Sequence, residues 1–544
     1  MSFQIHSIVG GEDVAGPGSI VSINPATEET IAEVPALDTG GAVRAVEAAR
    51  AAFGPWSRTP VAERQRLLAR WLELLVHRER ELAKLVSLEG GKPVLEARLV
   101  DIFPACEALS WTARKLHRLL AFRPEDPQQV LFAHWRAGYR FDPLGVIAII
   151  TPWNYPVGIP MAEIVPAVAA GNTVVFKPAS ATVLTGLMLA DLARQAGFPP
   201  GVINAVALPG SATDAVMEHP DVVKVLFTGS VDIGRHVARV CANRLVPAQL
   251  ELGGKDAAVV AADADLERTA RGLVWGAFMN SGQTCASIER AYVVEELHEP
   301  LVERIVELTG ELRVGDPSEV GTDLGPLTTR GQRDIVAAQV EQALAAGARA
   351  LTGGKLPEGK GLYYPPTVLV DVTGEMEVMR EETFGPVLPI VRVADLDEAI
   401  ARANASRFGL TASGWTRSAE VAERLERELE AGVVTVNDHV VVFAEPSGMW
   451  GGVKESGIGR AHGTFGFHEM VNVKYVARDM GGRKAAPWYY PYDEDFAHFI
   501  EVAMPALYLR GRQKISAMLS LMGTRRFRQR ALSPTLLLKS YKML

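Results

Sequence analysis

Two residues of this chain, Cys285 and Glu251, have side chains that can carry out covalent chemistry together. Cys285 ends the run NSGQTC, and Glu251 lies thirty-four positions earlier in the run QLELGGK. A thiolate attacks an electrophilic carbon and forms a covalent intermediate, which a positioned carboxylate can clear by taking a proton from water. The pair therefore predicts a nucleophile and a base that line one cleft.

Further motifs accompany this pair in a fixed order. Taken singly, each has a structural interpretation, because a buried cysteine packs as a small hydrophobe, Lys-Pro often ends a strand and Gly-Gly often forms a turn. These structural interpretations do not explain why all the motifs occur together in one chain. The motifs are TPWNYP at 151–156, GNTVVFKP at 171–178 and EETFGP at 381–386. With them the chain resembles the NAD(P)-dependent, hydrolytic aldehyde dehydrogenase superfamily from about Ile23 to about Val471, followed by an unusual C-terminal extension.

The resemblance implies oxidation of an aldehyde to a carboxylic acid through a thiohemiacetal and a thioester, without a metal. Cys285 matches the nucleophile, and Glu251 matches the base that activates water for hydrolysis of the thioester. The side-chain amide of Asn154 and the backbone N–H of Cys285 match the oxyanion hole, where donors must already point at the developing charge. In a CoA-acylating relative a thiol clears the thioester, and Glu251 argues against that alternative. A catalytically silent binding or structural member is disfavoured by the presence of all three residues.

The cofactor motif departs from the common dinucleotide fingerprint. Residues 227–234 read FTGSVDIG, a strand followed by a helix start, and no Gly-x-Gly-x-x-Gly follows the first sheet strand. In the family this wider spacing brings the pyrophosphate beside Ser230, where the helix N-terminus favours an anion. The other residues that match cofactor contacts are Pro152, Trp153, Lys177, Gly229, Gly234, Leu252, Glu382 and Phe384.

Ser180 bears on the choice between NAD and NADP. Many NAD-preferring relatives have a glutamate here that grips the ribose hydroxyls and would repel a 2′-phosphate. Because serine does not repel it, we expect NADP to be accepted, alongside NAD.

The substrate pocket is predicted to be apolar. The residues that match it in the family are Tyr155, Ile159, Thr284, Ala286 and Trp450. The loop from Asn437 to Trp450 contains no Arg or Lys, whereas a carboxylated aldehyde needs a fixed cation. A hydrophobic or aromatic aldehyde is expected; the alternative is that these side chains are simply core beneath the cleft.

The hydrophobic pattern predicts an α/β fold. Strongly periodic helices are expected to open the chain, including one over 61–88. Four short β-branched runs, separated by helical segments, then predict buried parallel strands of an open sheet; they are Val146–Ile150, Thr173–Phe176, Val202–Val206 and Val223–Phe227. A second strand–helix series runs from about Lys255 to about Val436.

With the resemblance, this pattern implies four parts. They are a Rossmann-type cofactor domain over 1–124 and 144–253, a small oligomerisation or bridging element over 125–143 and 471–485, an α/β catalytic domain over 254–470, and the extension 486–544.

The composition of the chain restricts where the protein is expected in the cell and what it is expected to bind. Among 544 residues there are only three cysteines, which form no disulfide framework, and the net charge of −8 gives no reason to expect nucleic acid. The N-terminus resembles no signal peptide, and no apolar run is long enough to cross a membrane. We expect a cytoplasmic homodimer or homotetramer that acts on a small-molecule aldehyde and does not associate with membranes.

The extension differs in charge from the rest of the chain. Residues 486–544 contain nine Lys and Arg against four Asp and Glu, a net charge of +5 that leaves −13 for the remainder. Such a basic, aromatic and aliphatic segment can dock on its own protein, on a neighbouring subunit or on an anionic membrane. We expect docking within the oligomer. His498, Glu501 and Pro505 interrupt the apolar stretch 496–509, which argues against insertion into a membrane. The alternative is a disordered tail, which the aromatic and aliphatic content of the segment disfavours.

Overall fold

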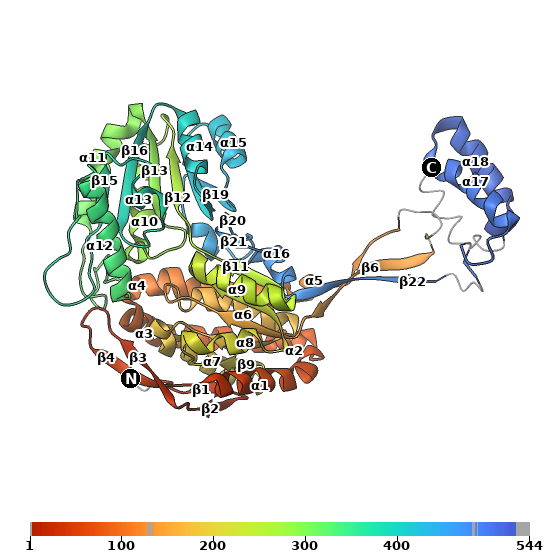
Figure 1. Cartoon of the computed structure of the whole chain (residues 1–544), viewed down its shortest axis with the longest axis horizontal. Coiled ribbons are helices and arrows are strands. Elements are labelled where there is room, and N and C mark those ends of the chain that lie inside the picture. The colour runs from red at the N-terminus through yellow and green to blue at the C-terminus, as the bar shows by residue number, and fades with distance from the viewer. Residues whose placement is uncertain (1–2, 128–131, 133, 481–484, 487, 529–544) are drawn as a thin grey trace. The chain divides into compact units, whose positions relative to one another are not determined.

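The computed structural model describes residues 3–127, 132, 134–480, 485–486 and 488–528. The chain forms two compact units (Figure 1). One consists of residues 1–119 and 143–472, and the other of residues 120–142 and 473–544.

The first unit contains an eight-stranded sheet with the order β2-β1-β9-β8-β7-β10-β11-β21. Its central strands are parallel, and β7 and β8 are buried throughout, as their β-branched composition predicts. Val146, Ala148 and Ile150 pack with helices α1 and α9 in one cluster, while the alternate residues point to the opposite face. The four predicted strands are confirmed. The strands are β1 (Ser7–Val9), β2 (Glu12–Val14), β7 (Val146–Ile150), β8 (Thr173–Lys177), β9 (Ile203–Ala205), β10 (Val222–Thr228), β11 (Ala248–Glu251) and β21 (Gly457–Ile458), and the helices are α1 (Thr39–Ser57), α6 (Gly158–Ala170), α7 (Val183–Ala196), α8 (Asp214–Met217) and α9 (Val231–Arg244).

The same unit contains a seven-stranded sheet with the order β14-β15-β16-β13-β12-β18-β19. Ala258 and Val260 of β12 pack against α10 and α11, whereas Ala257 and Val259 pack in the cluster that includes α12, α14 and α15. Helices thus cover both faces of a mostly parallel sheet, which is the α/β architecture that the sequence predicts. The strands are β12 (Asp256–Val260), β13 (Ile288–Val294), β14 (Arg349–Ala350), β15 (Thr367–Val370), β16 (Val387–Val393), β18 (Thr411–Trp415) and β19 (Val433–Val436), and the helices are α10 (Leu266–Phe278), α11 (Glu295–Glu311), α12 (Arg330–Ala345), α13 (Glu377–Arg380), α14 (Leu396–Asn404) and α15 (Ala419–Glu428).

Two predictions about the N-terminal region are wrong. The chain opens with four strands, β1, β2, β3 (Gly18–Ile23) and β4 (Thr30–Ala36), before its first helix. Strands of three residues such as β1 are too short to leave a periodic signal. The segment 61–88 is two helices, α2 (Val61–His77) and α3 (Glu79–Gly90), because Arg78 between them has φ −103° and ψ 8°. The remaining elements of this unit are α4 (Val94–Ala97), a π-helical turn (Arg98–Ile102), α5 (Phe103–Leu119), β17 (Phe408–Gly409), β20 (Val453–Lys454) and α16 (Gly463–His468).

The second unit contains a small sheet and a helical hairpin. The sheet has the order β22-β6-β5, formed by Val471–Asp479, Trp135–Pro143 and Arg123–Pro124. The hairpin consists of α17 (Glu494–Tyr508) and α18 (Gly511–Gly523), which pack around Phe499, Ala503, Ala506, Leu521 and Phe527. Among the described residues no helix is both long and apolar enough to cross a membrane.

Candidate active site

Cys285 lies where two cavities meet. The first has a volume of about 260 Å³ and the second about 300 Å³, and both are lined by Cys285 and by Ile159 of α6. The thiol can therefore act on a molecule in one cavity while a second molecule occupies the other.

The turn that precedes Cys285 has an unusual backbone conformation. Asn280, Ser281 and Gly282 follow one another with φ values of 54°, 53° and 71°. A Cβ at Gly282 would lie 2.0 Å from the carbonyl oxygen of Gly385, so only glycine fits there. The backbone N–H of Asn280 donates to the carboxylate of Glu96 at 2.7 Å. These contacts fix the end of the turn, and with it the position of the thiol.

Asn154 lies against the same turn. Its side-chain amide donates to the carbonyl oxygen of Gln283 at 3.0 Å, while no described residue donates to its Oδ1. Its backbone carbonyl accepts from Lys92 Nζ at 2.9 Å and from the Asn280 amide at 3.0 Å. Asn154 and Cys285 both line the second cavity, so the structure brings together the two predicted contributors to an oxyanion hole.

A buried charged cluster supports the loop that contains Asn154. Lys92 Nζ lies 3.3 Å from Asp101 and 3.8 Å from the centre of the Tyr155 ring. Asp101 accepts the backbone N–H groups of Val157 and Gly158 at 3.1 and 2.5 Å. Sequence reasoning missed this cluster, although a lysine in a run with as little other charge as SLEGGKPV is a recognisable signal.

Glu251 ends β11 and lines the second cavity with Cys285. Neither of its carboxylate oxygens has a hydrogen-bond partner among the described residues. Burial raises the pKa of Glu251 well above its usual value, the neighbouring carboxyl of Glu163 raises it further, and Arg460 opposes the shift. A carboxyl with a raised pKa is a stronger base toward water than an exposed glutamate.

The environment of Cys285 also disfavours negative charge. Burial raises the pKa of the thiol strongly, and Glu382, Asp256 and Glu251 raise it further, while the backbone N–H of Ala286 opposes the shift. The thiol is therefore protonated at neutral pH until another group stabilises the thiolate.

The first cavity is apolar. The five predicted pocket residues Tyr155, Ile159, Thr284, Ala286 and Trp450 all line it. The hydroxyl groups of Tyr155 and Thr284 bond each other at 2.6 Å, so these two polar groups satisfy one another. No Lys, Arg, Asp or Glu is found among the described residues that line the cavity.

Helical and loop residues complete this cavity, and sequence reasoning missed them. Leu99 and Phe103, which lie in and after the π-helical turn, line it although 63% and 52% of their surfaces are exposed. The one signal in the sequence is that these two apolar residues are four positions apart, on one face of a helix. The others are Val100, Pro104, Trp275, Met279, Val440, Val441, Phe443 and Ala444.

The second cavity contains most of the predicted cofactor residues. Ser230 is the N-cap of α9, and its side chain makes no capping hydrogen bond. The unpaired N–H groups of the first helical turn, together with the helix dipole, form a site suited to a pyrophosphate. The second cavity is therefore suited to the pyrophosphate and the adjoining part of a dinucleotide. The predicted residues that line it are Pro152, Trp153, Gly229, Ser230, Leu252, Glu382 and Phe384.

Three predicted cofactor residues do not line this cavity. Lys177 ends β8, where its ammonium donates to the carbonyl of Pro178 at 3.2 Å and burial lowers its pKa to about 8. Ser180 is exposed at the start of a short 3₁₀ turn. Gly234 packs under Leu252, where a Cβ would lie 2.5 Å from a methyl carbon. Gly234 thus permits close packing of α9.

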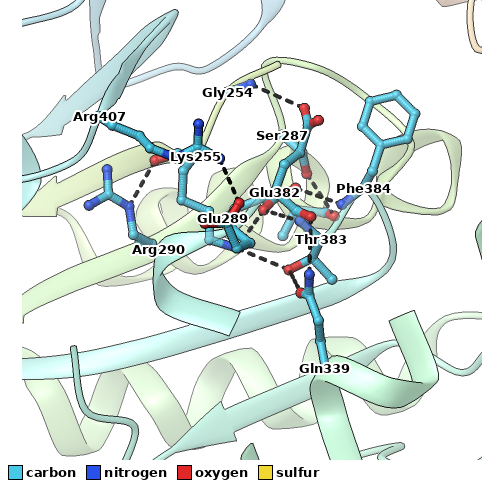
Figure 2. Close-up of polar contacts among 12 residues, drawn as sticks. Gly254, Lys255, Ser287, Glu289, Arg290, Gln339, Glu382, Thr383, Phe384 and Arg407 are labelled. Carbon is cyan, nitrogen blue, oxygen red and sulfur yellow. Dashed lines mark hydrogen bonds and ion pairs between the residues drawn. The ribbon is translucent and has the colours of Figure 1, made fainter. Parts of the chain in front are cut away.

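A buried network holds the loop of Glu382 and Phe384 (Figure 2). Glu289 of β13 accepts the backbone N–H groups of Thr383 and Phe384, both at 2.8 Å. Lys255 Nζ donates to Glu289 at 2.5 Å and to the Thr383 hydroxyl at 3.0 Å. Phe384, with φ 52°, meets the Trp153 ring edge-to-face at 5.5 Å. Sequence reasoning missed Glu289, a charged residue inside a fully buried strand.

Comparisons with known proteins agree with this geometry. The aldehyde dehydrogenase family model matches residues 14–476. Retinaldehyde dehydrogenase 3 of Homo sapiens is 37% identical over 466 residues, covering 85% of this chain and 90% of that protein. A succinate-semialdehyde dehydrogenase (NADP(+)) of Mycobacterium avium is 36% identical over 458 residues, covering 84% of this chain and 96% of that protein.

A solved structure, the NAD+ complex of an aldehyde dehydrogenase from Bacillus cereus, has a TM-score of 0.84 and 34% identity, covering 88% of this chain and 96% of that chain. The family match thus spans the seven-stranded sheet and the eight-stranded sheet from β7 onward, and it ends before the helical hairpin. The chain therefore belongs to the aldehyde dehydrogenase family and is an enzyme that oxidises aldehydes with NAD or NADP.

Proposed function

We propose that the enzyme oxidises bulky, uncharged hydrophobic or aromatic aldehydes to carboxylic acids through a covalent intermediate on Cys285. The observation that carries this proposal is the position of Cys285 between an apolar cavity and a cavity that contains the N-terminus of α9, Glu382 and Phe384. An aldehyde in the first cavity and a dinucleotide in the second both reach the same thiol.

The first half of the reaction forms a carbon–sulfur bond. Cys285 loses its proton to solvent, and the sulfur attacks the aldehyde carbon while the carbonyl electron pair moves to oxygen. The resulting oxyanion is stabilised by the Asn154 amide and the backbone N–H of Cys285. Ser230, Glu382 and Phe384 would hold a nicotinamide cofactor, which would supply the acceptor for the hydride that leaves the thiohemiacetal carbon. The carbon is thereby oxidised to a thioester.

The second half breaks the carbon–sulfur bond. Glu251 takes a proton from water, whose oxygen attacks the thioester carbon, and the sulfur of Cys285 leaves with the bonding electron pair. The products are the carboxylic acid and the Cys285 thiolate, with the proton on Glu251. Because neither carboxylate oxygen of Glu251 is bonded to a described residue, both are available to this water.

The substrate class is supported by the chemistry of the first cavity. The two curated relatives described above are named for retinaldehyde and for succinate semialdehyde, one substrate apolar and the other carboxylated. A carboxylate would lose its hydration in a cavity lined by apolar side chains, without a cation in compensation. The lining of the first cavity therefore favours apolar aldehydes over carboxylated ones.

Acceptance of NADP alongside NAD is part of the proposal. Ser180 is exposed and carries no charge, so it does not repel a phosphate. Lys177, three residues earlier, contributes a positive charge in the same segment.

We further propose that the three-stranded sheet of β5, β6 and β22 serves oligomerisation. Val473 and Tyr475 of β22 are half exposed, as expected for an apolar strand that a second subunit covers. Light scattering is expected to give a dimer or tetramer mass, and a monomer would contradict this assignment.

Steady-state kinetics test the reaction and the substrate class together. Decanal, retinaldehyde, benzaldehyde and succinate semialdehyde are each assayed with NAD and with NADP. The apolar aldehydes are expected to exceed succinate semialdehyde in kcat/KM by at least about tenfold, because the acid lacks a counter-ion in the cavity. A preference for succinate semialdehyde would reject the proposed substrate class.

A further inference from the structure

Helices α17 and α18 lie side by side (Figure 1) and enclose a hydrophobic core of their own. Arg526, which is 3% exposed, fixes the segment before α17 to the end of α18. Its guanidinium donates to the carbonyl oxygens of Tyr489 and Pro491 and to Asp493, and lies 4.5 Å from the Phe496 ring. The side chains on the outer surface of the hairpin are therefore held in defined positions.

Each helix of the hairpin presents an apolar stripe to solvent. On α18, Ile515, Leu519 and Met522 are 58%, 67% and 42% exposed, and their spacing of four and three residues places them on one face. On α17, Ile500 and Met504 are 44% and 55% exposed and are likewise one turn apart. We refer to these five residues as the apolar stripes. Exposed aliphatic side chains gathered in this way indicate an interaction surface.

The charge beside the apolar stripes is positive. After Glu501 the chain contains no Asp or Glu up to its end at Leu544, but it contains nine Lys and Arg. Three exposed bases lie where α17 is followed by α18: Arg510 in the connection, and Arg512 and Lys514 in the first turn of α18. Arg512 precedes Ile515 by three residues, so it lies on the same helix face. We refer to these three residues as the basic turn.

In the part of the chain that the structure describes, the carboxylates nearest in sequence to the basic turn have other partners or lie on α17. Asp493 and Asp495, at the start of α17, both pair with the buried Arg526. Glu494 and Glu501 are the only other Asp or Glu residues from 486 to the end of the chain, and both precede the basic turn.

We propose that the hairpin binds the surface of an anionic lipid bilayer. The apolar stripes enter the boundary between headgroups and acyl chains, and the basic turn contacts lipid phosphates. An amphipathic helix with basic residues beside its apolar face binds in the plane of such a surface, and each base near it increases binding roughly fivefold. The hairpin lies on the bilayer without crossing it, because α17 and α18 have 15 and 13 residues.

The proposal departs from two expectations drawn from the sequence. The sequence predicts docking within the oligomer, and it predicts no membrane association because polar residues interrupt the stretch 496–509. In the helix, however, Ile500 and Met504 lie together on the exposed side, while Phe499, Ala503 and Ala506 face α18. The polar interruptions therefore exclude insertion across a bilayer but not binding at its surface.

Co-sedimentation of the full chain with vesicles tests the proposal. Binding is expected to vesicles of phosphatidylcholine with about 30 mol% phosphatidylglycerol, and to fall at least tenfold with phosphatidylcholine alone or in about 0.5 M NaCl. Equal binding to both vesicles, or binding to neither, would overturn it. Because no substrate is present, failure here leaves the proposed reaction untouched.

Two variants and a matched control locate the surface. R510E/R512E/K514E and I515S/L519S/M522S are each expected to lose at least about tenfold in binding to the anionic vesicles, with unchanged kcat/KM for a small aldehyde as the check on folding. R70E/K84E/R114E makes the same charge change at exposed positions of the first unit and is expected to bind as the parent does. Equal losses in the control would mean that net charge alone drives binding and would overturn the assignment to the hairpin.

Other occupants of the apolar stripes give different results. If a second copy covers them, I515S/L519S/M522S changes the oligomer mass in light scattering and the parent does not bind vesicles. If the last sixteen residues, 529–544, cover them, only a chain that ends at Arg528 binds. Either result would overturn the proposal.

Discussion

The carboxylate of Glu289 accepts the backbone N–H of Phe384 at 2.8 Å, although 95 positions separate the two residues. Glu289 stands on a buried strand and is paired with Lys255, so the position of Phe384 beside the second cavity depends on a buried ion pair. Glu289, which lines neither cavity, thereby positions Phe384, which lines the second cavity.

Glu289→Gln is expected to weaken this support. It leaves the Lys255 ammonium buried without a counter-ion, which costs about 3–5 kcal/mol of unfolding free energy. The loop of Glu382 and Phe384 is also loosened, so KM for the cofactor should rise more than kcat falls. Urea unfolding and cofactor kinetics measure the two effects, with the exposed Glu303→Gln as a control that should change neither. If Glu289→Gln kept the wild-type stability and the wild-type KM for the cofactor, Glu289 would not be needed to hold this loop.

Cys285→Ser should abolish dehydrogenase activity and leave cofactor binding intact, because only the nucleophile is lost. Quenching of protein fluorescence by the cofactor and a rate assay test the two halves separately. Cys106→Ser, in which a partly exposed cysteine of α5 is replaced, should retain full activity. If C285S turned over within tenfold of the parent, covalent catalysis at this position would be excluded.

Glu251→Gln should still release reduced cofactor in the first turnover but should slow thioester hydrolysis, since an amide cannot take a proton from water. Rapid mixing is expected to show a burst equal to the number of active sites, followed by a slow steady state. The absence of the burst would mean that Glu251 is required before hydride transfer, which contradicts the assigned role.

Activity should rise as the pH increases above neutrality. Burial raises the pKa of both Glu251 and Cys285, and each must be deprotonated to act, so the active form gains population only as the pH passes these raised values. Glu163→Gln removes a neighbouring carboxyl that raises the pKa of Glu251 while keeping an oxygen that can accept from Thr228. The pH profile of thioester hydrolysis should therefore move toward acid, and a movement toward base would refute this electrostatic account.

Ser180→Glu should shift preference toward NAD, because the new carboxylate opposes a 2′-phosphate at close range. A lost or repelled charge contact of this kind is worth about 1–3 kcal/mol, or roughly ten- to a hundredfold in affinity. The ratio of kcat/KM for NADP to that for NAD measures the change, and Ser180→Gln controls for size. An unchanged ratio in Ser180→Glu would show that residue 180 does not face the ribose.

The local hydrophobic pattern was sufficient to predict strands that are buried along their whole length. Strands such as β7 and β8 are buried on both faces, and each was predicted nearly to its ends because a short run of four or five β-branched or apolar residues is typical of a buried strand. The break at Arg78 could not be predicted, since Leu75 before it and Leu82 after it continue the same helical periodicity.

The sequence by itself determined the reaction class, because the order and identity of the motifs around Asn154, Glu251 and Cys285 are properties of the chain. Only the tertiary structure decided that Cys285 joins two cavities, that Leu99 and Phe103 extend the apolar one, and that Glu289 holds Phe384. The same holds for the exposure of Ile515 and Leu519. Cavities, pKa shifts and exposed faces arise from groups that are distant in sequence and close in space, and the physical terms that govern them depend on distance and burial.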